Sequence, residues 1–77
     1  MNVEDLNKYV NEESVRGDLT RQLLEVHSDY TNGKINAKIR DELLLSIENG
    51  FQAEDTHKNE QTAKFLRSAV YALMQVV

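Results

Sequence analysis

Residues 55–77 read DTHKNEQTAKFLRSAVYALMQVV, and the apolar positions in this segment predict a long C-terminal helix. These positions form two adjacent rows with spacings of three and four residues. One row contains Ala63, Leu66, Val70, Leu73 and Val77, and the other contains Phe65, Ala69, Ala72 and Val76. One small domain seldom needs so wide an apolar stripe. We therefore expect this helix to pack within its own domain on one side and against a second copy or a partner on the other.

The rest of the chain is divided by three single glycines and contains no proline. A short N-terminal helix is indicated by the spacing of Val3, Leu6 and Val10. A second helix, about residues 12–31, is predicted after an N-cap at Asn11 or Ser14. It has the clearest apolar row of the first half, which consists of Val15, Leu19, Leu23, Val26 and Tyr30.

A third helix is predicted over residues 36–49, with Asn36 as N-cap and an end at Asn49-Gly50. It places Ile39, Leu43 and Ile47 on one apolar face, with Leu44 widening this face and Leu45 outside it. The last helix is expected over residues 56–77, capped by Asp55 or Thr56. No segment alternates with the period of a strand. The predicted fold is all-α, a single domain over residues 1–77 with three main helices and a short N-terminal one.

Composition narrows the classes of function. A 77-residue chain without cysteine has no disulfide and no thiolate metal site, so oligomerisation is the expected way to gain stability. No secretory signal and no membrane-spanning run is recognisable, which predicts a cytoplasmic protein without membrane contact. The net charge is −4, and residues 1–18 hold most of the excess. We expect residues 1–14 to form an acidic, mobile segment that can meet a basic partner surface, and we do not expect nonspecific nucleic-acid binding.

Residues with catalytic or metal-binding chemistry are few. His27 and His57 have no metal-ligating residue three or four positions further along a helix, so neither predicts a zinc site. Adjacent carboxylates such as Asp41 and Glu42 point about 100° apart on a helix and cannot face each other. The three glycines stand singly and form no phosphate-binding loop. The sequence therefore predicts a protein that is not an enzyme and that has no cofactor and no metal.

The C-terminal half, about residues 34–77, resembles a family of small phage proteins that counter the bacterial CBASS immune system by sequestering cyclic oligonucleotides in helical oligomers. The matching residues are Ile39-Arg40-Asp41 on one helix and Leu66-x-x-Ala69-Val70 on the next, at a similar separation. The first 30 residues lack the basic and aromatic segment of that family, so no site residues are transferred. The resemblance implies a helical oligomer that acts as an immune antagonist.

The function that we predict is a non-enzymatic helical homo-oligomer that binds a protein partner, as a phage- or mobile-element-encoded inhibitor or adaptor does. Its partner surface is expected at the acidic N-terminal segment or on an exposed face of the helical hairpin. The expected self-contact consists of Phe65, Leu66, Ala69, Val70, Leu73, Val76 and Val77. The expected partner or ligand contacts are Glu4, Asp5, Glu12, Glu13, Arg40, Arg67 and Tyr71.

Two alternatives remain at this point. An oligomeric sponge for a small anionic ligand, such as a cyclic oligonucleotide, would need cations gathered between subunits, drawn from Lys58, Lys64, Arg67 and Arg40. A DNA-binding regulator would need the start of the third helix to present Asn36, Lys38 and Arg40 together from a dimer.

Overall fold

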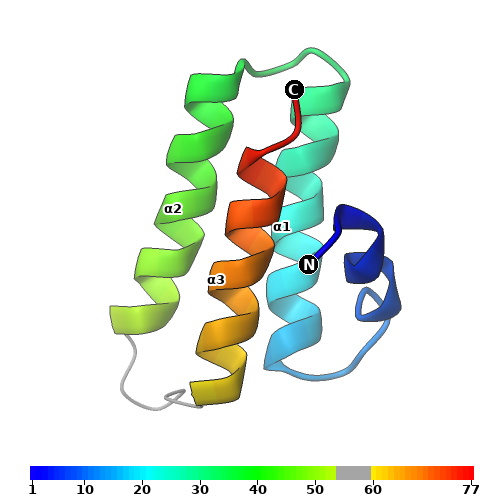
Figure 1. The fold of residues 1–77 in the computed structure, drawn as a ribbon, viewed down its shortest axis with the longest axis vertical. Helices are drawn as coiled ribbons and strands as arrows, with labels where there is room; N and C mark the ends of the chain where they lie inside the picture. The colour runs from blue at the N-terminus through cyan, green and yellow to red at the C-terminus, as the bar shows by residue number, and fades with distance from the viewer. Residues whose placement is uncertain (54–59) are drawn as a thin grey trace.

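The computed structural model describes residues 1–53 and 60–77, and these form a helical bundle (Figure 1). A short 3-10 helix, η1 (Val3–Lys8), precedes three α-helices, α1 (Val15–Thr31), α2 (Ala37–Ala53) and α3 (Glu60–Met74). No strand occurs among these described residues. The predicted all-α fold with three main helices and a short N-terminal helix is confirmed. No helix in the described part of the chain is long and apolar enough to span a membrane.

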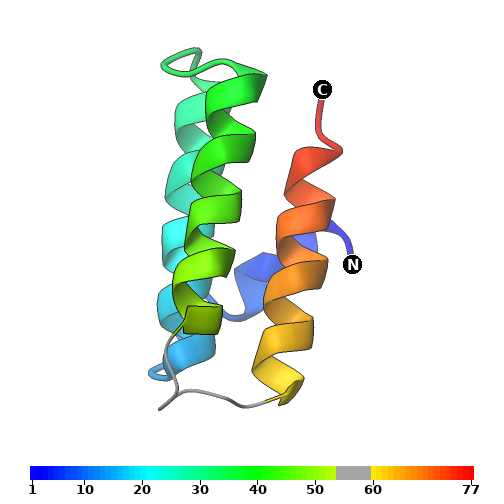
Figure 2. The same cartoon turned by 90° about the vertical axis from the view of Figure 1, so that its left-hand side faces the viewer.

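Helices α1 and α2 run antiparallel as a hairpin, and α3 packs against both of them (Figure 1). Figure 2 shows α3 on one side of this pair, while η1 lies against α3. The core lies between these elements and is built from one row of each, namely Leu6, Leu19, Leu23, Leu44, Leu66, Ala69, Val70 and Leu73. Since α3 covers only one face of the hairpin, the opposite face of α1 and α2 has no described helix over it.

Helix α1 begins at Val15, with Ser14 as N-cap, and not at residue 12 as expected. The Ser14 hydroxyl accepts a hydrogen bond of 3.1 Å from the backbone N–H of Gly17. Gly17 was expected to separate helical pieces, but it lies in the first turn of α1 and is buried. A Cβ at this position would lie 1.9 Å from the backbone oxygen of Glu12, so the close approach of residues 9–14 requires glycine.

The hairpin turn and the start of α2 agree with the prediction. Gly33 has φ +76°, a conformation that glycine adopts without steric cost. The Asn36 side chain caps α2 by accepting a hydrogen bond of 2.9 Å from the N–H of Ile39.

The end of α2 differs from the prediction. The helix does not stop at Asn49-Gly50 but continues through Gly50 to Ala53. A glycine inside a helix costs roughly 0.5–1 kcal/mol. Phe51, the next residue, packs against the hydrophobic core, and this burial offsets the cost.

Helix α3 ends at Met74 and does not reach residue 77 as expected. Two short-range bonds close it, from the N–H of Gln75 to the oxygen of Ala72 and from the N–H of Val76 to the oxygen of Leu73. Arg40 of α2 then binds the carbonyl oxygens of Met74 and Val76 at 3.1 and 2.5 Å. The predicted start of this helix at residue 56, with its cap at residue 55 or 56, lies outside the described residues.

Candidate functional site

An open groove runs along the face of α1 and α2 that α3 leaves uncovered. Its volume is about 480 Å³, and only these two helices line it. Helix α1 contributes Val15, Asp18, Leu19 and Gln22, and helix α2 contributes Ser46, Ile47, Gly50 and Phe51. We call this surface, together with its continuation along the same helix faces, the hairpin groove. It combines an apolar floor with polar edges, which is the usual composition of a site that binds another molecule.

The apolar surface of α2 continues beyond the groove lining through Ile39 and Leu43. Positions 39, 43, 46, 47 and 50 are spaced by three and four residues and therefore share one side of the helix. Ile39 and Leu43 are each 41% exposed, and Val15 across the groove is 38% exposed. The predicted apolar face of this helix is therefore largely exposed at Ile39 and Leu43, because the core side is centred on Arg40 and Leu44.

Leu45 provides a contrast within the same helix. It is 42% exposed, nearly the same as Leu43, and was correctly expected to lie outside the apolar face. Two residues along a helix correspond to about 200° of rotation, so Leu43 and Leu45 point to opposite sides of α2. The two leucines therefore form a matched pair, of which only Leu43 belongs to the hairpin groove.

A row of acidic residues lies beside the groove on α1. Asp18 lines the groove, and Gln22, Glu25 and Asp29 follow it at spacings of four, three and four residues. Sequence reasoning missed this edge, because it treated the apolar row of α1 alone and placed the acidic excess in residues 1–18, which contain Asp18 but neither Glu25 nor Asp29. The available signal was the spacing of three carboxylates beside an apolar row on the neighbouring helix.

The predicted self-contact on α3 is mostly buried within the chain itself. Leu66, Ala69, Val70 and Leu73 are 0–2% exposed, so these four residues offer no surface to a second copy. Each predicted row therefore contributes part of its length to the core of the single chain, and only the remaining members are left for a second copy. Phe65 is half-buried and meets Tyr9 edge to face, with ring centroids 5.1 Å apart.

A second groove of about 430 Å³ lies where the N-terminus meets the outer side of α3. It is lined by Met1, Asn2, Val3, Ser68, Tyr71, Ala72, Gln75 and Val76. Tyr71 is 67% exposed. Of the predicted self-contact, only Phe65, Val76 and Val77 keep accessible surface, and of these Val76 lines this groove.

The acidic N-terminal residues are partly engaged in local structure. Asp5 and Asn2 form a capping box at the start of η1, and Lys8 lies 3.7 Å from the Asp5 carboxylate. Glu4 and Glu13 are exposed. Residues 1–14 are folded against the bundle, since Leu6 is fully buried and η1 packs on α3.

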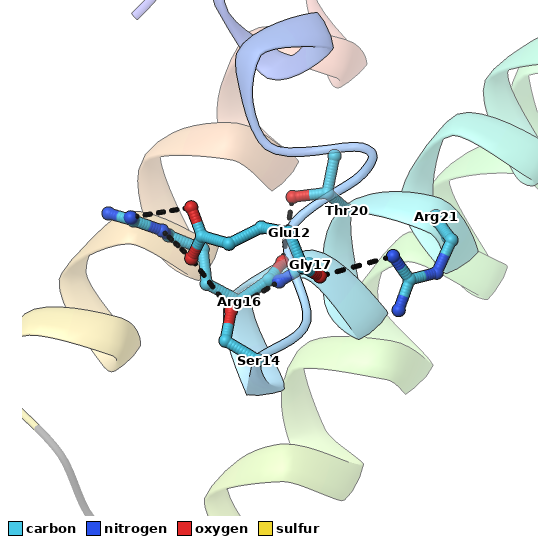
Figure 3. Close-up of polar contacts among 6 residues, drawn as sticks. All are labelled: Glu12, Ser14, Arg16, Gly17, Thr20 and Arg21. Carbon is cyan, nitrogen blue, oxygen red and sulfur yellow. Dashed lines mark hydrogen bonds and ion pairs between the residues drawn. The ribbon is translucent and has the colours of Figure 1, made fainter.

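Glu12 forms the centre of a polar cluster at the start of α1 (Figure 3). Its carboxylate accepts hydrogen bonds from Nε and Nη2 of Arg16 at 3.0 and 2.8 Å and from the Ser14 hydroxyl at 2.7 Å. The Arg16 bonds, followed by the Ser14 bond, lower the pKa of Glu12 below its usual range, and Glu12 in turn raises the pKa of Arg16. Arg21 donates from Nη1 to the Glu12 carbonyl at 3.3 Å, as Figure 3 also shows. We read this cluster as structural, because it ties residues 9–14 to α1.

Arg40 does not have the accessibility that a ligand contact needs. It is 3% exposed, and its guanidinium lies 4.2 Å from the ring centroid of Tyr30. Besides the two carbonyls at the end of α3, it binds the Asp41 carboxylate at 2.9 Å. The predicted role of Arg40 as a partner or ligand contact therefore does not fit its burial.

Of the other predicted cations, the structure describes Lys64 and Arg67. Lys64 pairs with Glu60 at 3.8 Å, Arg67 is exposed, and Lys58 lies outside the described residues. The predicted DNA-reading set is divided. Asn36 is exposed but its side chain caps α2, Lys38 is exposed, and Arg40 is buried.

Within residues 1–53 and 60–77, no group of three or more His, Asp or Glu side chains could hold a metal ion. His27 is half-buried, and its Nδ1 is buried without a hydrogen-bond partner, while His57 lies outside the described residues. Comparison of the chain with protein-family models, curated protein sequences and solved structures finds no match. The function is therefore argued from the two grooves and the charges around them.

Proposed function

We propose that this protein is a non-enzymatic binding protein that engages a protein partner through the hairpin groove. The observation that carries the proposal is the exposed apolar surface along one side of the hairpin. Val15, Ile39 and Leu43, each about two-fifths exposed, continue the apolar floor formed by Leu19, Ile47 and Phe51. Contiguous apolar surface with a polar edge is typical of protein-interaction sites.

The geometry of the hairpin favours a protein partner over a small molecule. The groove is a long, open furrow between two helices, whereas small-molecule sites enclose most of the ligand surface. Two antiparallel helices with an uncovered apolar seam can accept a third element packed along them, as α3 does on the other side. An adaptor or inhibitor of this size would bind in this way.

Site-specific photo-crosslinking tests this proposal. A photoreactive amino acid at position 43 should give a discrete covalent adduct with one protein in the cells that produce this chain. The same amino acid at position 45 is the matched control, because Leu43 and Leu45 are equally exposed on opposite sides of α2. An adduct that forms equally from both positions, or from neither, would overturn the proposal.

We further propose a self-contact through the second groove, beside α3. The supporting observation is the exposed Tyr71 beside Val76 in this groove, since Val76 is an accessible member of the predicted interface. Light scattering on a size-exclusion column from micromolar to hundreds of micromolar protein should show a dimer or larger species. Tyr71→Glu should reduce this species to a monomer while the circular dichroism spectrum stays unchanged. A monomeric wild-type protein at all concentrations would exclude the self-contact.

A further inference from the structure

We infer that the occupant of the hairpin groove is a basic amphipathic α-helix of a partner protein. Its apolar side would lie on the groove floor, and its Lys or Arg residues would lie beside α1. This inference rests on the proposed function, since it names the chemistry of the partner that the groove binds. It follows from the length of the apolar row, the charge beside it and the absence of cations from the same rows.

The two edges of the groove have the same length. The apolar side of α2 extends from Ile39 to Gly50, and the acidic row of α1 extends from Asp18 to Asp29, twelve residues and eleven helical rises in each case. At 1.5 Å per residue, each edge is about 16 Å long, or about three helical turns. A helix of three to four turns laid along the hairpin would contact both edges over their full length. It would complete a four-helix arrangement with α3 on the opposite side.

The carboxylates beside the groove are available for pairing. Glu25 is exposed and Asp29 half-buried, and neither forms an ion pair in the part of the chain that the structure describes. Asp18 pairs with Arg21, which also donates to the carbonyl of Val10. Complementary charges at the rim of an interface direct the approach and the register of a partner. Lys or Arg at spacings of three and four residues on the partner helix would meet this row.

Other occupants would leave this charge unmatched. In a second copy, the rows that face the groove carry Asp18, Gln22, Glu25 and Asp29 on α1 and Ile39, Leu43, Ser46 and Gly50 on α2, without a cation. An anionic membrane surface or a nucleic-acid backbone would be repelled by the same carboxylates. A basic amphipathic helix satisfies both the apolar floor and the acidic edge, and helix-in-groove binding is a recurring mode of peptide recognition.

The test uses two synthetic amphipathic peptides of equal length with the same leucine face. One carries lysine and the other glutamate on its polar face, and binding to the full chain is measured by fluorescence anisotropy. We expect the lysine peptide to bind at least about tenfold more tightly than the glutamate peptide, with an affinity that falls as salt rises. Leu43→Asp should weaken this binding, and Leu45→Asp should leave it unchanged.

Charge-reversal variants test whether the acidic row of α1 is the surface that contacts the lysine side chains of the peptide. The double variant Glu25→Lys with Asp29→Lys should bind the lysine peptide about tenfold more weakly than the wild type does, and it should bind the glutamate peptide more tightly. The double variant Glu4→Lys with Glu60→Lys changes the net charge equally at exposed positions on η1 and α3, outside the two helices that line the groove, and it should have little effect. Circular dichroism verifies that each variant remains folded.

Three results would overturn the inference: no binding of the lysine peptide at hundreds of micromolar, equal binding of both peptides, or equal loss from both double variants. Equal binding of both peptides that still depends on Leu43 would refute the basic helix and keep the hairpin groove as the partner site. If Leu43→Asp left peptide binding unchanged and the photoreactive residue at position 43 formed no adduct, the proposed function itself would be refuted.

Discussion

Replacement of Gly17 by alanine tests how tightly residues 9–14 are packed over the start of α1. The added Cβ would lie 1.9 Å from the backbone oxygen of Glu12 and 2.8 Å from its carbonyl carbon. A close carbon–oxygen contact is about 3.3 Å, so this carbonyl must retreat by about 1.4 Å. The obstacle is backbone, which cannot swing away as a side-chain end can. Both the backbone of residues 9–14 and the first turn of α1 are therefore affected.

The loss in the free energy of unfolding can be estimated from the interactions that the displaced Glu12 carbonyl would disturb. Strain from an added methyl group in a well-packed site typically costs about 1–3 kcal/mol. The hydrogen bonds from Arg21 to the carbonyls of Val10 and Glu12, at 2.8 and 3.3 Å, would weaken with it, at about 0.5–1.5 kcal/mol each. The higher helix propensity of alanine returns about 1 kcal/mol. We expect a net loss of about 2 kcal/mol in the free energy of unfolding.

Thermal and denaturant unfolding, followed by far-UV circular dichroism, measures this loss. For a chain of this size, about 2 kcal/mol corresponds to a decrease in Tm on the order of 10 °C. Gly50→Ala is the matched control, because a Cβ at Gly50 meets no atom within 4 Å and the residue is helical. That variant should gain roughly 0.5–1 kcal/mol. If Gly17→Ala were stabilising to the same degree as Gly50→Ala, the close approach at Gly17 would be refuted.

Three further predictions concern the buried arginine, the polar cluster and the core. Arg40→Met leaves two carbonyls at the end of α3 without their donor and should cost about 2–3 kcal/mol in chemical denaturation, whereas Arg67→Met should change stability little. Arg16 lowers the pKa of Glu12 in the folded chain, so their interaction stabilises the fold above the ordinary carboxyl pKa and is lost as the pH falls through the lowered pKa. In Glu12→Gln, the denaturation midpoint should therefore change less with pH between about pH 6 and about pH 3 than in the wild type. An unchanged pH profile would contradict the ion pair. Val70→Asp places a charge at a position only 2% exposed and should unfold the chain at room temperature by circular dichroism; a folded variant would show that this residue lies outside the core.

Helix positions were predictable from local signals, while their ends depended on contacts between distant segments. The caps Ser14 and Asn36 act through neighbouring backbone N–H groups, so sequence alone predicts them. The end of α3 depends on Arg40, which is 34 residues before the first carbonyl that it binds. No local pattern encodes such a contact. The continuation of α2 through Gly50 likewise depends on the packing of Phe51 against the core.

The candidate site could be predicted only in outline. An exposed face of the hairpin was expected as one partner surface, but the sequence did not indicate which residues form it. Periodicity shows that Ile39 and Leu43 share a side of the helix with Ile47, yet it does not show which side meets α3. The side of α2 that faces the core is set by a buried arginine. The aliphatic stem of Arg40 lies on the core side of the helix next to Leu44, and its guanidinium packs over the ring of Tyr30. The apolar row beside it is thereby turned toward solvent.

The apolar surface left for a partner is therefore found on the hairpin more than on α3. Helix α3 was expected to face outward because its apolar stripe is wide, but it contacts α1, α2 and η1 and needs most of that width within the chain. The N-terminal residues cover part of this apolar stripe, because Leu6 of η1 is buried in the core and Tyr9 packs on Phe65. Helices α1 and α2 receive cover from α3 on one face only. An acidic edge along α1 and exposed leucine and isoleucine along α2 then give the uncovered face a composition that selects a basic, apolar partner.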